Sequence, residues 1–344
     1  MISRDGVWAS PDTGYLPLEV ISVIIVNWNG RGYLAECLNS LRKQSFRRFS
    51  TILVDNGSTD GSVAFVRRNY PEVRLEALSR NTGFSAANNF AIRTVRSPYI
   101  ALLNNDAVAH PQWLKTLVEA LDARPEAGFA ASRILFYQDR TIVDRAGDSY
   151  STAGSGLLRG RGSPADAFDS KEWVFGACAA AALYRRSLFH DIGLFDEDFF
   201  LLYEDVDLSF RAQLRNYQCL YVPDAVVYHR ASGSIVHDSP VSVYYSHRNL
   251  EWVYVQNMPG RLIARTILLH VVYNLAAGFY FSANGRMVDF IRAKWDACKG
   301  MRKALQKRRQ IQKNRTASDF YIWRLLEKEQ FFPRLAIRFG KRPR

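Results

Sequence analysis

Apolar and polar residues alternate along the first third of the chain in two periods, which predict strands and helices in turn. Residues 20–26 form an almost continuous β-branched run, which is typical of a strand buried on both faces. Leu34, Cys37, Leu38 and Leu41 then follow a helical spacing. Further strands are expected over residues 51–54, 73–78 and 99–103, with helices over 60–68 and 85–95. Strands joined by helices of this length predict a mostly parallel sheet with right-handed crossovers.

The pattern is less regular in the middle of the chain. Residues 150–168 are rich in glycine, serine and arginine, so we expect a mobile loop there. An alanine-rich apolar run over residues 173–184 predicts that regular structure resumes, and residues 206–215 have the spacing of a helix. The first two-thirds of the chain therefore indicate an α/β fold.

Composition is that of a globular protein with a sizeable core. The chain has 344 residues, of which 48% are hydrophobic and 23% charged, enough for one large domain or a catalytic domain with an appendage. Its four cysteines form no C-x-x-C pair, which favours a reduced compartment over a disulfide framework. Residues 1–18 are polar and lack the apolar core of a secretory signal, so we expect an N-terminal tail.

The net charge of +13 is concentrated near the C-terminus. Residues 259–344 contain 20 of the 46 Lys and Arg but only 5 of the 33 Asp and Glu, which leaves a net charge of −2 elsewhere. This asymmetry predicts an anionic partner for the last quarter of the chain, either nucleic acid or an anionic membrane surface.

An apolar run within this basic segment favours the membrane. Residues 267–281 are mainly apolar and aromatic, yet shorter than the ~20 residues that span a bilayer. Basic residues lie on both sides, as in helices that lie at a membrane interface. The alternative is a buried helix followed by a solvated basic helix. Nucleic acid is an unlikely partner, because the segment lacks zinc-ligand spacing and RNA-binding aromatic signatures.

Residues that could carry a reaction lie at the ends of two predicted strands and at the start of one predicted helix. Asn104-Asn105-Asp106 comes directly after the apolar run 99–103, and His229 ends a later one. Between them, Glu204 and Asp205 directly precede the helix expected over residues 206–215, and Asp207 follows two residues later. In open α/β sheets, ligands collect at the carboxyl ends of strands. Turn formation and helix capping could explain each group separately, but three acids within four positions exceed what capping requires. Together these residues suggest a metal-assisted transfer site with a separate general base.

A nicotinamide-dependent oxidoreductase is the main alternative. Residues 30–35 fit G-x-G-x-x-A, and Asp55 ends the second predicted strand, where a ribose-binding acid would lie. However, residues 27–29 separate the first strand from the first glycine, whereas this fingerprint places its glycines in the turn itself. A non-catalytic nucleotide-binding or nucleic-acid-binding protein is a further alternative.

Four segments resemble family 2 glycosyltransferases, which are inverting, nucleotide-sugar-dependent enzymes of the GT-A fold. They are residues 26–30, 55–62, 81–89 and 102–106, and later segments at 175–178, 193–197 and 199–212 extend the match to about residues 20–255. Within the family the chain is most similar to rhamnosyltransferases that build bacterial surface polysaccharides.

The resemblance implies the nucleotide-diphospho-sugar transferase fold, a Rossmann-like mixed sheet flanked by helices, with a basic helical extension. We expect a catalytic domain over residues 19–258, divided into a nucleotide-binding half (19–110) and an acceptor-binding half (111–258). Residues 259–344 would form the helical extension.

The resemblance also assigns roles on the donor side. Asp55 would accept a hydrogen bond from the ring N–H of uracil or thymine. Asp106 would bind Mn²⁺ or Mg²⁺ on the diphosphate as the last residue of the D-x-D motif, although Asn104 replaces the first acid. His229 would be the second protein ligand, with His237 as fallback. The nucleotide-sugar contacts would be Asn27, Asp55, Asn81, Asn88, Asn104 and Asn105.

On the acceptor side the resemblance makes Asp205 the general base. One base suffices, because an inverting transfer needs no covalent intermediate. Glu204 and Asp207 would support it, and Trp173 would stack on an acceptor sugar, although a tryptophan in an apolar strand is more often core.

The resulting hypothesis is transfer of a sugar, rhamnose or another deoxyhexose, from a dTDP- or UDP-sugar. The acceptor would be a polysaccharide or a polyprenyl-diphosphate-linked glycan in cell-surface glycan synthesis. We expect a cytoplasmic protein that is peripheral on the inner membrane and contacts anionic lipid through residues 259–344.

Overall fold

The computed structural model describes residues 19–230 and 238–328. Its first half holds four parallel strands, β1 (Ile21–Asn27), β2 (Phe49–Asp55), β3 (Arg74–Ala77) and β4 (Tyr99–Leu103). β1 lies between β2 and β4, and β3 pairs with the other edge of β2. The helices α1 (Arg31–Arg42), α2 (Ser62–Asn69) and α3 (Phe84–Ile92) connect them. The strands and helices expected in this half are therefore confirmed.

The second half makes the sheet mixed. Its strands are β5 (Ala107–Ala109), β6 (Ala127–Phe136), β7 (Val143–Ala146), β10 (Glu172–Val174), β11 (Ala181–Arg185) and β12 (Gln218–His229). The main sheet has the order β10-β12-β6-β11-β4-β1-β2-β3, with β5 on β12 and β7 on β6. β11 runs antiparallel to both β4 and β6, so the parallel pairing that was expected holds for β1–β4 and for the β6–β12 pair, and the sheet as a whole is mixed.

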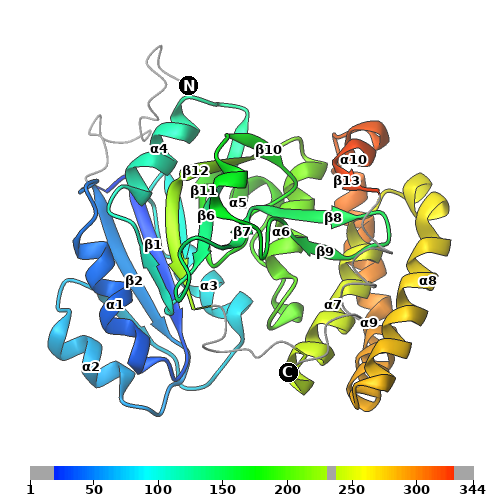
Figure 1. The fold of residues 1–344 in the computed structure, drawn as a ribbon, viewed down its shortest axis with the longest axis horizontal. Helices are drawn as coiled ribbons and strands as arrows, with labels where there is room; N and C mark the ends of the chain where they lie inside the picture. The colour runs from blue at the N-terminus through cyan, green and yellow to red at the C-terminus, as the bar shows by residue number, and fades with distance from the viewer. Residues whose placement is uncertain (1–18, 231–237, 329–344) are drawn as a thin grey trace.

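Helices cover both faces of this sheet, and each face has its own apolar core (Figure 1). On one face, α1, α2 and α4 (Trp113–Asp122) pack against the strands, with Leu38, Val66 and Leu117 buried. On the other face lie α3, α5 (Arg186–Ile192) and α6 (Glu204–Leu214), with Ala91 and Leu188 buried. This sandwich positions the strand ends that carry the candidate site.

The expected loop at 150–168 is wrong in part. β8 (Asp148–Ser151) and β9 (Gly156–Leu158) form a hairpin, followed by a 3₁₀ turn over Ala165–Phe168, and β8 also pairs with β13 (Leu326–Glu327). Tyr150 is buried and stacks on Phe175. Gly154 supplies the positive φ of the turn (+86°). The glycines that suggested a loop are thus turn residues around short strands.

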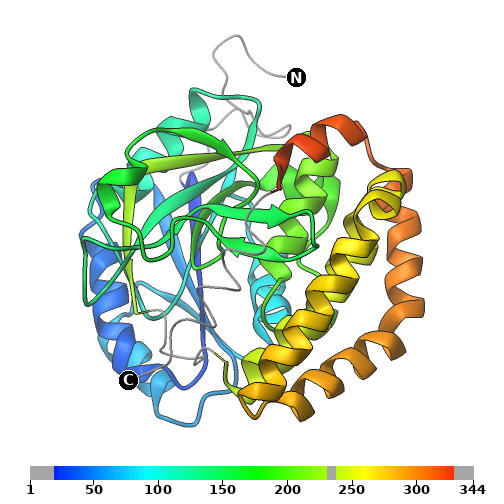
Figure 2. The same cartoon turned by 45° about the vertical axis from the view of Figure 1, so that its right-hand side comes forward.

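Four C-terminal helices form a layer at one end of the sheet (Figures 1 and 2). They are α7 (Pro240–Asn257), α8 (Gly260–Ala283), α9 (Met287–Lys313) and α10 (Asp319–Leu325). A third apolar core, which includes Phe210 of α6, Trp252 of α7 and Ile322 of α10, joins this layer to the rest of the protein. The basic segment is therefore packed on the sheet domain over its described residues.

Candidate active site

A cleft of about 390 Å³ begins at the carboxyl ends of β4 and β12. It passes the β7–β8 segment and the start of α6 and ends at α7 and α8. Its lining includes six titratable side chains near the strand ends: Asp106, Arg145, Asp148, Glu204, Asp205 and His229. Two separate clusters can be distinguished among them.

The first cluster brings together Asp106 and His229, as predicted. β5 begins directly after Asp106 and pairs antiparallel with β12, so that Ala107 faces His229. His229 Nε2 lies 3.2 Å from Asp106 Oδ1 and 3.3 Å from Asn104 Nδ2. His237 lies outside the described residues.

Asp144 orients this histidine from behind. Its Oδ2 lies 2.8 Å from His229 Nδ1, and its Oδ1 accepts a hydrogen bond of 2.6 Å from Arg161. A carboxylate at Nδ1 fixes the ring and leaves Nε2 directed at Asp106. Burial lowers the pKa of His229, but hydrogen bonds to Asp106 and Asp144 raise it to about 9. Metal ligation requires a neutral imidazole, so His229 would lose this proton on binding a cation.

This donor set fits Mn²⁺ or Mg²⁺. One carboxylate and one oriented imidazole leave coordination positions for the oxygens of a diphosphate. The amide of Asn104 beside the histidine supplies no second charge, which agrees with the departure from the D-x-D pattern.

Buried amides surround Asp55 at the ends of β1 and β2. Asn27 Nδ2 donates to Asp55 Oδ1 at 2.9 Å, and Asn105 Nδ2 donates to Asn27 Oδ1 at 2.8 Å. The backbone N–H of Ser58 donates to Asp55 Oδ2 at 2.9 Å. A Cβ on Gly30 would lie 2.1 Å from Asn105 Nδ2, so this glycine is needed for close approach. Each carboxylate oxygen keeps capacity for one further hydrogen bond.

Two other predicted nucleotide contacts form hydrogen bonds with nearby backbone groups. Asn81 Oδ1 accepts from the Gly83 N–H at 2.9 Å, and Asn88 Nδ2 donates to the Phe84 carbonyl at 2.9 Å. Of the six predicted nucleotide-sugar contacts, Asn104 alone lines the cleft. Contact of the others with a nucleotide stays a prediction.

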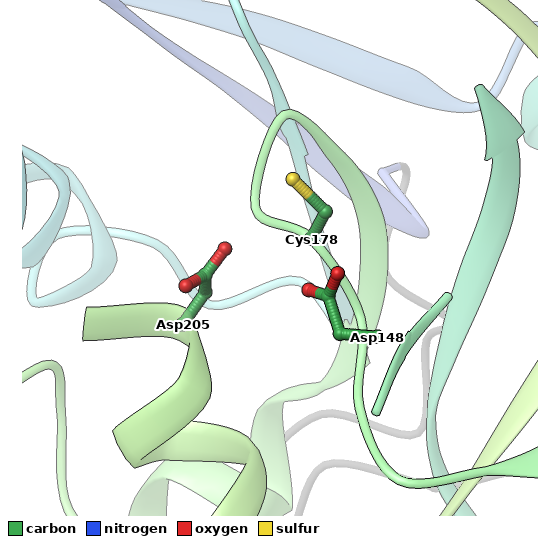
Figure 3. Close-up of side chains that lie close together, drawn as sticks. All are labelled: Asp148, Cys178 and Asp205. Carbon is green, nitrogen blue, oxygen red and sulfur yellow. The ribbon is translucent and has the colours of Figure 1, made fainter. Parts of the chain in front are cut away.

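The second cluster centres on Asp205 at the N-terminus of α6. Its Oδ2 accepts from the Ala179 N–H at 3.2 Å, and its Oδ1 from the Val206 N–H at 2.8 Å. Asp148 and Cys178 point toward the same space (Figure 3), and ligand atoms of the three residues lie within 4.8 Å of one another.

Burial and mutual repulsion raise the pKa values in this cluster. Burial raises the pKa of Asp205, against the hydrogen bond from Ala179 and the charge of Arg145. Burial, opposed by Arg145 and aided by Asp205, raises the pKa of Asp148 to about 7. Burial and Asp205 also raise the pKa of Glu204. A raised pKa makes Asp205 a stronger base than an exposed aspartate.

The same three residues are a poor metal site. Burial raises the pKa of Cys178, so its sulfur stays a protonated thiol, whereas metal binding requires the thiolate. Arg145 Nε lies 3.4 Å from Asp148 Oδ1 and competes with any cation. We therefore assign the cluster to acid–base chemistry.

Two residues predicted for the acceptor side do not line the cleft. Asp207 is buried, with Arg211 Nε at 2.8 Å from Oδ2 and Asn257 Nδ2 at 2.8 Å from Oδ1. Oδ1 ties α6 to α7 and Oδ2 pairs with Arg211 of α6 itself, so both oxygens are occupied and we keep only Glu204 as a supporting acid. Trp173 lies on the edge strand β10, opposite Leu220 and 42% exposed, and its stacking on an acceptor stays a prediction.

Sequence reasoning missed the residues that support both clusters. Asp144, Arg145 and Asp148 lie on and beside β7, and Arg161 follows β9. The available signal was the cluster of three charged residues, Asp144, Arg145 and Asp148, within five positions directly after the β-branched pair at 142–143.

The family follows from this geometry and from comparison with known sequences. Residues 22–193, half of the chain, match the model of Glycosyl transferase family 2. The chain belongs to this family. Its membership excludes the oxidoreductase and the non-catalytic alternatives as descriptions of this domain. The chain is therefore a glycosyltransferase, with Gly30 serving close packing rather than a dinucleotide fingerprint.

Relatives of this glycosyltransferase include a rhamnosyltransferase and an O-antigen biosynthesis protein. N-acetylglucosaminyl-diphospho-decaprenol L-rhamnosyltransferase of Mycobacterium tuberculosis is 28% identical over 263 residues, 69% of this chain and 84% of the relative. O-antigen biosynthesis protein RfbC of Myxococcus xanthus is 28% identical over 225 residues, 62% of this chain but 17% of the relative.

Solved structures agree on the fold. TarS 1–349 of S. aureus in complex with UDP has a TM-score of 0.52 and 19% identity, covering 85% of this chain and 90% of that one. The mannosyltransferase PcManGT from Pyrobaculum calidifontis, in complex with GDP-Man and Mn²⁺, has a TM-score of 0.52 and 16% identity, covering 85% and 84%. The GT-A fold expected from the sequence is thus confirmed.

Proposed function

We propose that this glycosyltransferase transfers rhamnose or another deoxyhexose from a dTDP- or UDP-sugar to a lipid-linked or polysaccharide acceptor in cell-surface glycan synthesis. The observation that carries the proposal is one cleft with the Asp106–His229 pair at one end and Asp205 farther along. The donor class and acceptor class are supported by the name of the mycobacterial relative.

The donor side would bind and orient the nucleotide diphosphate. Asp55 would accept the ring N–H of the pyrimidine, while Asn27 and Asn105 hold its carboxylate in place. Asp106 and His229 would hold Mn²⁺ or Mg²⁺, whose charge stabilises the leaving diphosphate. Asp144 keeps His229 Nε2 directed into the cleft.

Asp205 would act on the acceptor. Its carboxylate takes the proton of the acceptor hydroxyl as that oxygen forms a bond to the anomeric carbon. The bond between the anomeric carbon and the diphosphate oxygen breaks, and the nucleoside diphosphate leaves with the electron pair. The proton remains on Asp205, whose raised pKa favours this transfer.

The far end of the cleft suits a lipid-linked acceptor. It is lined by Ser242 and Ser246 of α7 and by Tyr273 and Phe281 of α8. One side of α8 thus forms part of the cleft wall. Its other side is exposed and apolar, with Leu268 77% and Leu275 70% exposed. An acceptor could keep its lipid in a membrane against α8 and extend its glycan toward Asp205.

We infer that α8 lies along the membrane surface. The helix has 24 residues and is long and apolar enough to cross a membrane, but 28% of its most apolar window is buried in the protein. His270, on its buried side, lies 2.8 Å from the Ala153 carbonyl and 3.0 Å from Glu251. Lys294 of α9 lies 2.5 Å from the same glutamate. These buried polar groups favour an interfacial helix over a spanning one.

Basic residues at the ends of α8 complement anionic headgroups. Arg261 and Arg265 lie in its first two turns, and Arg286 follows its end. Each Lys or Arg near an anionic surface contributes about 1 kcal/mol. A peripheral position on the cytoplasmic face of the inner membrane, where nucleotide sugars and anionic lipid meet, follows from this proposal.

A transfer assay with purified full-length protein tests the proposal. The donors are dTDP-rhamnose, UDP-N-acetylglucosamine and GDP-mannose with Mn²⁺, the acceptor is N-acetylglucosaminyl-diphospho-polyprenol in anionic vesicles, and products are followed by mass spectrometry. We expect a deoxyhexose added from the dTDP donor. Transfer from GDP-mannose alone, or no transfer from any pyrimidine donor, would overturn the assignment.

A further inference from the structure

The segment that leads into α6 has an unusual backbone. Phe200, Leu202 and Tyr203 have φ values of 62°, 65° and 70°, in the left-handed region that disfavours residues other than glycine. Such conformations cost on the order of 1–3 kcal/mol each and persist only where the surroundings impose them. We call residues 198–203 the base loop, because Asp205 follows it directly in the first turn of α6.

Asn249 of α7 binds the base loop from one side. It is fully buried, and its Nδ2 lies 3.0 Å from the Phe199 carbonyl oxygen, 2.9 Å from that of Leu201 and 2.6 Å from that of Leu202. A single amide has two N–H groups, so the three carbonyls share them. These carbonyls surround Phe200 and Leu202, two of the left-handed residues.

Two further contacts complete the restraint. Arg248 Nη2 donates to the carbonyls of Asp198 and Phe199, each at 2.9 Å. On the opposite side, the Phe84 N–H donates to the Phe200 carbonyl at 2.6 Å. A Cβ on Gly83 would lie 2.6 Å from that carbonyl oxygen, so the start of α3 must approach closely. The base loop is therefore clamped between α3 and α7.

We propose that Asn249 is a positioning residue, which sets the place of Asp205 by holding the base loop in its left-handed conformation. This inference rests on the proposed role of Asp205 as the base. α7 also lines the acceptor end of the cleft through Ser242 and Ser246, so one helix positions both the acceptor wall and the base. The C-terminal layer is then part of the catalytic unit as well as a membrane contact.

Asn249→Ala tests the inference, with Gln44→Ala as a matched control. Gln44 is a fully buried amide that, like Asn249, donates to backbone carbonyls, those of Ser40 and His110, and it contacts neither α6 nor the base loop. We expect Asn249→Ala to lower kcat about 10- to 100-fold with the KM for the sugar nucleotide changed less than about 3-fold. Gln44→Ala should lower the melting temperature comparably and keep kcat within about 3-fold.

Two readouts separate positioning from stability. In Asn249→Ala the acidic limb of the pH–kcat profile should move, because Asp205 leaves its buried place. Glycine adopts positive φ without strain, so Leu202→Gly added to Asn249→Ala should restore kcat at least about 3-fold. If Asn249→Ala is recovered only as aggregate, Arg248→Gln replaces it, with a smaller loss of kcat in the same direction.

The outcomes are distinct. A wild-type protein that transfers no sugar would contradict the proposed function. An active wild type with an unchanged kcat and pH profile in Asn249→Ala, an equal loss of kcat in Gln44→Ala, or no rescue by Leu202→Gly would each overturn the positioning role.

Discussion

The proposed donor and acceptor regions place buried carboxylates in opposite surroundings. On the donor side, Asp55 is surrounded by neutral donors from Asn27 and the Ser58 backbone. On the acceptor side, Asp148 and Asp205 crowd together. Hydrogen-bond donors stabilise a carboxylate and give a fixed shape for recognition, whereas burial beside like charge raises its pKa and gives a base. Recognition and catalysis thus use the same residue type in different surroundings.

The largest expected effect concerns the acceptor side. Asp205→Asn removes the proton acceptor and keeps the side-chain shape, so kcat should fall on the order of 10²- to 10⁴-fold. Binding of dTDP with Mn²⁺, followed by isothermal titration calorimetry, should stay within about 2-fold. An equal loss of turnover and nucleotide affinity would contradict the assignment, since a group that acts only in the transition state spares ground-state binding.

The next effect concerns the orientation of the metal ligand. Asp144→Asn weakens the hydrogen bond to His229 Nδ1. Loss of a hydrogen-bond partner of a metal-binding histidine lowers metal affinity about 10- to 100-fold. The Mn²⁺ concentration needed for half-maximal dTDP binding should rise by that factor. Asp166→Asn makes the same charge change at an exposed position and is the control. It should leave this Mn²⁺ concentration unchanged.

A smaller effect concerns the outer surface of α8. Leu268→Glu with Leu275→Glu places two charges on its exposed apolar side, which should reduce co-sedimentation with anionic vesicles about 10-fold. Transfer to a water-soluble acceptor should stay within about 2-fold. Unchanged vesicle binding would show that α8 does not face the lipid.

The smallest effect concerns the charge next to the base. Asp148 loses its proton near pH 7 and then carries a negative charge beside Asp205, so Asp148→Asn should remove the step that this charge adds to the pH–kcat/KM profile near pH 7, with under about 3-fold change in kcat/KM at neutral pH. A step near pH 7 that persists in the variant would show that Asp148 does not influence the base.

Asp148→Asn should also change how the free energy of unfolding depends on pH. The pKa of Asp148 is raised to about 7, above its unfolded value, so its stabilising contribution is present in acid and lost as the pH rises through 7. Asp148→Asn should therefore be more stable than the wild type at pH 8, by on the order of 1 kcal/mol, and lose this advantage near pH 4. Urea unfolding at both pH values measures this.

Local pattern predicted the first half of the fold because β1, β2 and β4 are mainly apolar and buried, and regular helices separate the strands. It did not predict the direction of β11, which is decided by its neighbours in the sheet. It also missed the β8–β9 hairpin, whose glycines lie in turns while Tyr150 is core. The family motifs predicted the closeness of Asp106 and His229. Asp144 and Asp148 escaped notice because their positions depend on tertiary pairing, of β7 with β6 for Asp144 and of Asp148 with β9 and Gly176.

Binding of dTDP to the wild type and to His229→Ala, titrated with and without Mn²⁺, tests the central claim most directly. The account predicts that Mn²⁺ strengthens dTDP binding to the wild type at least about 10-fold and that His229→Ala removes this dependence. Nucleotide affinity that is indifferent to Mn²⁺ in the wild type, or fully Mn²⁺-dependent in the variant, would contradict a metal-assisted site at Asp106 and His229.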